Sequence, residues 1–164
     1  MPQERFWKEL HQLKFQINVV EAHFCKAEKW DRGLKMLLAI TSSASIGAWV
    51  IWRELSIVWA GVIAASHVVT AISPHLPFKE RRVAFASMLH ELEALFIQTE
   101  LKWQEVASGE MGEGEINKAR SLICTQKQAI LKKHIPSSVI PNDIEINSSA
   151  EVLAASYFSN FYPT

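Results

Sequence analysis

Hydrophobic residues near the start of the chain recur at alternating steps of four and three. This spacing keeps one apolar stripe on one side of an α-helix and is typical of helices that pair as coiled coils. We therefore predict one N-terminal amphipathic helix over residues 1–33, packed through its stripe against a partner helix or a neighbouring copy. The stripe consists of Phe6, Leu10, Leu13, Ile17, Val20 and Phe24.

Two long uncharged runs follow this helix, and only Arg53 and Glu54 separate them. Residues 36–52 form a run of 17, and residues 55–78 form a run of 24. A helix needs roughly 20 apolar residues to cross a bilayer core of about 30 Å. We therefore predict a two-pass transmembrane helical hairpin over residues 34–78. Its spans are expected at about residues 34–52 and 55–74.

Cations gather at the outer ends of this hydrophobic segment and are scarce at its turn, where Arg53 stands alone. Positively charged residues beside a span favour the cytoplasmic side of the membrane. Both termini are therefore predicted to be cytoplasmic, in a multi-pass protein of the inner membrane. The flanking cations are Lys26, Lys29, Arg32 and Lys35 before the spans, and Lys79, Arg81 and Arg82 after them.

Residues 79–134 are predicted to form further cytoplasmic helices with the same kind of apolar stripe. Gly109 and Gly112 interrupt the pattern and predict a turn between two helices. Because the hairpin returns the chain to its starting side, the first of these helices should lie beside the N-terminal helix in a coiled-coil-like domain. The stripe residues are Leu89, Leu92, Phe96, Thr99, Trp103 and Val106, followed by Ile116, Ala119, Ile123 and Ile130.

The end of the chain, residues 135–164, is predicted to form a strap and a short helix. β-Branched residues between Ser137 and Ile146, bounded by prolines, favour an extended segment or a short strand. Ser148 and Glu151 have the spacing of a capping box, which predicts that the last helix begins there. The predicted fold class is all-α.

Polar side chains inside the predicted spans are candidates for a conducting path. Ser66, Thr70 and Ser73 share one face of the second span. Their hydroxyls could line a water-filled path, or could bond to a carbonyl one turn back or to a neighbouring helix. His67 lies near the middle of that span, where an ionisable group usually faces protein or water. The candidate pore-lining residues are Thr41, Ser45, Ser66, His67, Thr70 and Ser73.

Small residues at four-residue spacing allow transmembrane helices to approach closely. They therefore join the stripe residues as candidates for helix packing, either within one chain or between copies. The candidate packing residues are Ile17, Val20, Phe24, Ala39, Ser43, Gly47, Leu92 and Phe96.

Composition and motifs point away from catalysis. Seventeen basic and 17 acidic residues balance, which gives no attraction to a nucleic-acid polymer. The sequence has no glycine-rich phosphate loop after a strand, no zinc spacing of Cys and His, and no nucleophile signature. We therefore expect no enzyme, no metal site and no cofactor. Cys25 and Cys124 are expected to be reduced thiols.

The order of these elements resembles the SLATT family of two-helix membrane effectors, which occur in bacterial conflict and anti-phage systems. The resemblance rests on the leading helix ending in Lys29-Trp30-Asp31-Arg32 and on the pair of spans across Arg53-Glu54. It extends through the trailing helix, from Lys79 into Leu101-Lys102-Trp103-Gln104-Glu105-Val106-Ala107-Ser108-Gly109-Glu110, and covers residues 4 to 134.

The resemblance implies an oligomeric effector that permeabilises or depolarises the bacterial inner membrane when its cytoplasmic domain is triggered. Because the sequence has no recognisable sensor domain, the trigger is expected from a separate sensor protein or a nucleotide second messenger. Membrane lipid and further copies of the chain are the other expected partners. The main alternative is a non-enzymatic membrane anchor or scaffold for a cytoplasmic complex. A soluble bundle would have to bury 43 nearly charge-free residues beneath 121 others.

Overall fold

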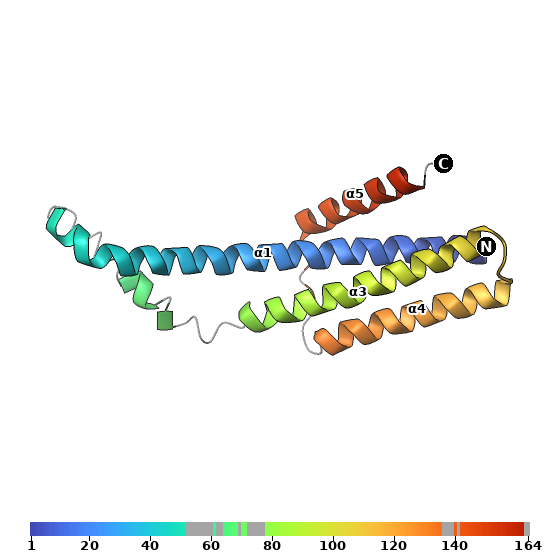
Figure 1. The fold of residues 1–164 in the computed structure, drawn as a ribbon, viewed down its shortest axis with the longest axis horizontal. Coiled ribbons are helices and arrows are strands. Elements are labelled where there is room, and N and C mark those ends of the chain that lie inside the picture. Colours follow the sequence, from blue (N-terminus) through green and yellow to red (C-terminus); the bar gives the residue numbers. More distant parts are fainter. Residues whose placement is uncertain are drawn as a thin grey trace. The chain divides into compact units, whose positions relative to one another are not determined.

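A computed structural model describes residues 1–51, 61, 64–68, 70–71, 78–135, 140 and 142–162. Their side chains are described except at residues 40–51 and 78–81. The elements are α1 (Pro2–Ile51), α3 (Phe78–Ala107), α4 (Glu113–His134) and α5 (Ile144–Phe161) (Figure 1). The all-α prediction is confirmed, because the described residues contain helices and no strand.

The chain divides into two compact units. Met1–Phe24 and Val83–Thr164 form the first, which we call the bundle. Cys25–Arg82 forms the second, which we call the central unit. This division follows the charge pattern, because the long uncharged runs fall in the central unit.

The first predicted stripe forms the centre of the bundle. Phe6, Leu10, Leu13 and Val20 are fully buried, Ile17 is nearly so, and Phe24 is half-buried. The helix does not end at the predicted boundary near Gly33, because α1 is helical from Pro2 through to Ile51.

Helix α3 lies antiparallel to the bundle part of α1. The side-chain amide of Gln3 donates to the carbonyl of Val106 at 3.3 Å, while the ring of His23 stacks on Phe85 with centroids 6.2 Å apart. Contacts at both ends of α3 therefore fix the register between the helices. Leu92 and Phe96 are buried against α1, as the second heptad stripe predicts.

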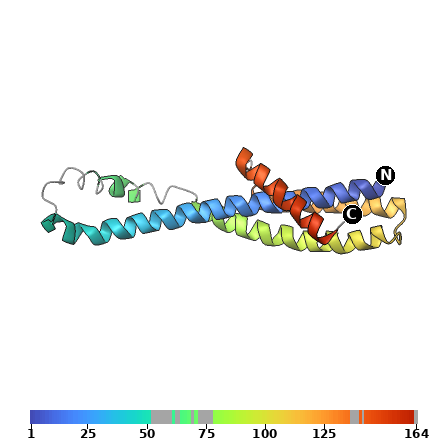
Figure 2. The ribbon, with the colours of Figure 1, turned by 90° about the horizontal axis from the view of Figure 1, so that it is seen from above.

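Helices α4 and α5 cover opposite faces of the α1–α3 pair (Figures 1 and 2). Helix α4 reaches both partners through ion pairs, from Lys127 to Glu9 on α1 and from Lys133 to Glu91 on α3. Helix α5 reaches both through aromatic contacts described below. The outer edge of α3 is left exposed at Val83, Ile97 and Leu101.

The turn between α3 and α4 contains two glycines, of which Gly109 is conformationally required. Gly109 has φ of 78°, in the left-handed region that side chains with a Cβ rarely adopt. Gly112 is the N-cap of α4, and its backbone N–H donates to the Glu115 carboxylate at 2.9 Å. The turn predicted from these glycines is confirmed.

The last helix begins earlier than predicted. Asp143 is the N-cap of α5, and its side chain accepts from the backbone N–H groups of Glu145 and Ile146. Asp143 is a good N-cap because a short carboxylate satisfies N–H groups that have no helical partner. The capping box at Ser148 is therefore wrong, as is the extended interpretation of residues 144–146. Helix α5 has 18 residues and is not short.

The stripe residues, which were predicted to pack either within one chain or between copies, lie in the core of a single chain. Ile17 is 3% exposed and Leu92 is fully buried, and Val20 and Phe96 pack in the same cluster. The N-terminal and trailing stripes are covered by each other and by α4 and α5. They leave no apolar seam for a neighbouring copy, so an oligomer must use other surfaces.

Among the described residues, no helix combines the length and apolarity that a membrane crossing requires. Parts of both predicted spans lie outside those residues. They include residues 52, 55–60, 62–63, 69 and 72–74, together with the side chains of residues 40–51.

Candidate functional site

Asp31 joins the beginning and the end of the central unit through ion pairs. Its Oδ2 accepts from Lys35 Nζ at 2.7 Å and from Arg82 Nη1 at 2.9 Å. Lys35 lies one turn further along the same helix, whereas Arg82 is 51 positions later in the chain. The segment between Asp31 and Arg82 therefore leaves from one point and returns to it. We call this group the base clasp.

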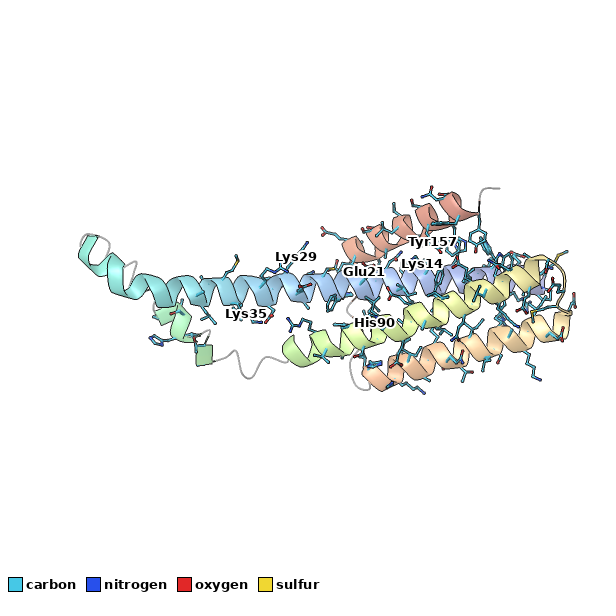
Figure 3. All side chains as sticks on the ribbon, viewed as in Figure 1. Lys14, Glu21, Lys29, Lys35, His90 and Tyr157 are labelled. Carbon is cyan, nitrogen blue, oxygen red and sulfur yellow. The ribbon has the colours of Figure 1, made fainter. Side chains whose placement is uncertain are left out.

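Exposed cations and a tryptophan accompany the base clasp on α1. Trp30 is 67% exposed, and Lys29 and Lys35 are also exposed (Figure 3). Arg32 is paired with Glu28 on the same helix at 3.1 Å. Cationic and amphipathic aromatic side chains of this kind suit the headgroup level of an anionic bilayer.

The described pore candidates include a hydroxyl that is satisfied within its own segment. Thr70 Oγ1 donates to the carbonyl of Ser66 at 2.8 Å, the back-bonding alternative considered for this stripe. Thr70 and His67 are exposed and Ser66 is half-buried. Ser73 lies outside the described residues. Nothing beyond the helical backbone is described at the pore candidates Thr41 and Ser45 or at the packing candidates Ser43 and Gly47. Ala39 is exposed.

Two tyrosines attach α5 to α3 through one carboxylate. Tyr157 and Tyr162 donate their hydroxyls to Glu100 Oε1 at 2.8 and 3.0 Å. Burial, followed by the hydrogen bond and the negative charge of Glu100, raises the pKa of both tyrosines to about 12. Lys14 on α1 places its ammonium 4.5 Å from the centroid of the Tyr157 ring (Figure 3). Both phenols are thereby held in their neutral, donating form.

Aromatic rings attach α5 to α1. His11 stacks on Phe158 with ring centroids 3.7 Å apart, and Trp7 meets the same Phe158 edge-on at 5.0 Å. The Nε2 atom of His11 is buried and makes no hydrogen bond. Burial lowers the pKa of His11, because a charged imidazole would lose water here without gaining a partner.

A buried ion pair joins α1 to α4. Lys127 donates to Glu9, and both side chains are about nine-tenths buried. Burial, and then the neighbouring Glu9 charge, raises the pKa of the Cys124 thiol. This pair was not predicted from the sequence, although Lys127 stands at the stripe position between Ile123 and Ile130. A lysine at a core position of the apolar stripe could have predicted a buried acidic partner.

Two hollows flank Phe15 at the outer edge of α1. The larger, about 380 Å³, lies toward α5 and is lined by His11, Gln12, Phe15, Glu151, Ala154 and Ala155. The smaller, about 210 Å³, lies toward the end of α4 and the connection to α5. It is lined by Phe15, Gln16, Val19, Val20, Leu131, Ile140, Asn142 and Asn147. The half-buried ring of Phe15 is therefore a ridge between two depressions.

Within the part of the chain that the structure describes, no three His, Cys, Asp or Glu side chains are grouped closely enough to hold a metal ion. His90 and Glu93 approach to 3.8 Å on the surface of α3. Cys25 is exposed and Cys124 is partly buried, and both are free thiols.

Comparisons with family models, with curated proteins and with solved structures found no match to this chain. The function is therefore argued from the clasp, the bundle and the hydrophobic segment themselves.

Proposed function

We propose that this chain is an oligomeric membrane effector, which permeabilises or depolarises a bacterial inner membrane when its helical bundle is triggered. The observation that carries the proposal is the base clasp. Asp31 and Arg82 meet at 2.9 Å, and the residues between positions 36 and 78 include only two charged side chains, Arg53 and Glu54.

A hydrophobic segment whose two ends are joined by an ion pair suits a membrane hairpin. In hydrocarbon, backbone groups must be satisfied within the protein, which favours two antiparallel helices for such a segment. The clasp would stand at the headgroup level, with Trp30 and the exposed lysines beside it. The bundle would then lie in the cytoplasm together with both termini.

Triggering requires the bundle to pass a signal to the hairpin. Helix α1 supports such coupling, because its single run from Pro2 to Ile51 contributes residues to both units. A separate sensor protein or a nucleotide second messenger would act on the bundle, and the hairpins of several copies would then open a path. Membrane lipid and further copies of the chain are the partners this function needs.

Ion flux through liposomes distinguishes the effector from a membrane anchor or scaffold. Purified full-length chain, reconstituted at high protein-to-lipid ratio to favour assembly, should release potassium. Ser66→Leu and Thr70→Leu should reduce that release while leaving the oligomer intact, because bulky apolar groups would obstruct a water-filled path. Ser66→Ala and Thr70→Val are the matched controls, since they remove the hydroxyls without adding much bulk.

The alternative outcomes separate the hypotheses. No potassium release from inserted and assembled wild-type chain favours the scaffold. If Ser66→Leu and Thr70→Leu release potassium at the wild-type rate, Ser66 and Thr70 do not line the path. The Thr70 hydroxyl then serves only its hydrogen bond to the Ser66 carbonyl.

A further inference from the structure

The larger hollow, about 380 Å³, is a cavity where α5 crosses α1 obliquely (Figure 2). Helix α5 contributes two alanines to it, and side chains this short leave space between crossing helices. The volume falls within the roughly 300–1,000 Å³ that is typical of pockets for small molecules. The lining residues are His11, Gln12, Phe15, Glu151, Ala154 and Ala155.

Two polar side chains of this cavity have hydrogen-bonding capacity that the chain does not use. Among the described residues, the Glu151 carboxylate forms no ion pair and accepts no hydrogen bond. The Gln12 carboxamide likewise has no hydrogen-bond partner within the described ranges. Both side chains are exposed, so a ligand in the cavity can reach them.

No lysine or arginine is found among the described lining residues to balance the charge of Glu151. The cations nearest in sequence on α1 have partners elsewhere. Lys8 is paired with Glu4 at 2.8 Å, and the ammonium of Lys14 lies 4.5 Å from the centroid of the Tyr157 ring. The cavity therefore carries one negative charge.

The His11 ring gives the cavity an uncharged aromatic wall. It stacks on Phe158 with centroids 3.7 Å apart, and burial lowers its pKa, so the imidazole is neutral at pH 7. The half-buried ring of Phe15 is a second aromatic wall. Aromatic faces of this kind attract cations and pack well against flat apolar groups.

We propose that this cavity binds a small organic ammonium ion with an aromatic body. The Glu151 carboxylate pairs with the ammonium group, the Gln12 carbonyl oxygen accepts one of its hydrogens, and the body lies against Phe15 and the alanines. Phosphates and carboxylates do not fit, because their charge has the same sign as that of Glu151. All six lining residues belong to the bundle, so the site does not depend on the proposed membrane function.

Occupancy of the cavity has a structural consequence. A ligand held by Gln12 on α1 and Glu151 on α5 contacts both helices at once. Because it binds only the form in which the two helices are together, it stabilises the attachment of α5 to α1. Hydrogen exchange of α5 amides should therefore slow when the cavity is filled.

Three small probes that share a phenyl ring test the charge preference: phenethylammonium, phenethyl alcohol and phenylacetate. Each is titrated into full-length chain in nonionic detergent, with isotope-labelled histidine observed by nuclear magnetic resonance. Phenethylammonium should shift the His11 signal to saturation, whereas the signal of His90, at an exposed position, should stay in place. Phenethyl alcohol should bind about fivefold more weakly, as expected for losing an ion pair worth roughly 1 kcal/mol, and phenylacetate should not bind.

Two pairs of variants test the site itself. Glu151→Gln should weaken phenethylammonium binding about fivefold, whereas Glu145→Gln, at an exposed position in the first turn of the same helix, should not. Ala155→Leu should abolish binding, because the longer side chain fills the cavity. Ser156→Leu adds similar bulk at the next exposed position of α5, outside the cavity, and should leave binding unchanged.

Equal affinity for phenethylammonium and phenethyl alcohol, or tighter binding of phenylacetate, would overturn the proposed ligand class. Saturable binding that persists unchanged in Ala155→Leu would overturn the site, and would also identify amine that had only entered the detergent micelle. A His11 signal that no probe moves would overturn both. Potassium release plays no part in these measurements, so their failure leaves the membrane function to its own test.

Discussion

The buried pair between Glu9 and Lys127 predicts that single and double substitutions will have opposite consequences. Both side chains are about nine-tenths buried between α1 and α4, so removing either one leaves a charge without water or a partner. Breaking a pair of this kind typically costs about 3–5 kcal/mol. That is a large share of the roughly 5–15 kcal/mol by which a domain is stable.

Lys127→Met should therefore destabilise the bundle by about 3–5 kcal/mol, and Glu9→Leu by a similar amount. The double variant should return to within about 1 kcal/mol of the wild type, because no buried charge remains and the apolar side chains fill similar volume. Lys102→Met is the control, since Lys102 and Glu105 form an exposed pair that should contribute about 0–1 kcal/mol.

Hydrogen exchange of α4 peptides, measured on full-length chain in detergent, reports these differences without a denaturant. Each 1.4 kcal/mol changes an opening equilibrium about tenfold. Protection of α4 amides should then fall roughly 150-fold to several thousand-fold in either single variant and recover in the double variant. Costs that simply add in the double variant would refute the argument, because they would mean that the two charges do not depend on each other.

Three further predictions concern titration and thiol reactivity. Because the pKa of His11 is lowered by burial, the bundle should lose stability as pH falls below about 6.5, the ordinary value for histidine. Hydrogen exchange of α5 amides should show this loss in the wild type and in the exposed control His90→Gln, but not in His11→Gln. An unchanged pH profile in His11→Gln would exclude His11 as the cause. Tyr157 and Tyr162 are the two tyrosines of the chain, so absorbance of the phenolates should rise near pH 12 and the bundle should lose stability above about pH 10. Glu100→Ala should shift the absorbance rise toward pH 10. A wild-type rise at pH 10 would contradict the burial of the two phenols and their shared hydrogen bonds to Glu100. Cys25 should react with a maleimide faster than Cys124, whose pKa is raised by burial, and equal rates at neutral pH would contradict that packing.

The bundle shows how far periodicity can predict a helical core. Heptad steps identified Leu10, Ile17, Leu92 and Phe96 correctly, because a helix that buries one side must repeat apolar residues at that spacing. The same steps could not identify the partner of each stripe. We left open whether the stripes pack within one chain or between copies, and α4 and α5 cover these residues within one chain.

The errors at α5 have a local cause. A run of β-branched residues around Ile144 favoured an extended segment, but Asp143 provides an N-cap and packing on α1 and α3 stabilises the helix. Tertiary contacts often override weak intrinsic preferences of this kind. Phe158 and Tyr157 contribute most of those contacts, and their partners Trp7, His11 and Glu100 lie far away in the sequence.

The candidate site was predictable in part. Lys29 and Arg32 were recognised from their place beside the hydrophobic segment, but the pairing of Asp31 with Arg82 was not. Two residues 51 positions apart give no periodic pattern that a single sequence could reveal. The exposed apolar residues on the outer edge of α3, at Val83, Ile97 and Leu101, were missed for a different reason. The more hydrophobic core stripe was already enough to predict the helix.

Topology labelling tests the membrane hairpin most directly. In full-length chain with Cys25→Ser and Cys124→Ala, Glu54→Cys marks the turn and Glu110→Cys marks the exposed loop between α3 and α4. An impermeant maleimide applied to intact bacterial spheroplasts should label Glu54→Cys at once, and should label Glu110→Cys only after lysis. Equal labelling of both positions before lysis, or labelling of Glu54→Cys only after lysis, would contradict the hairpin.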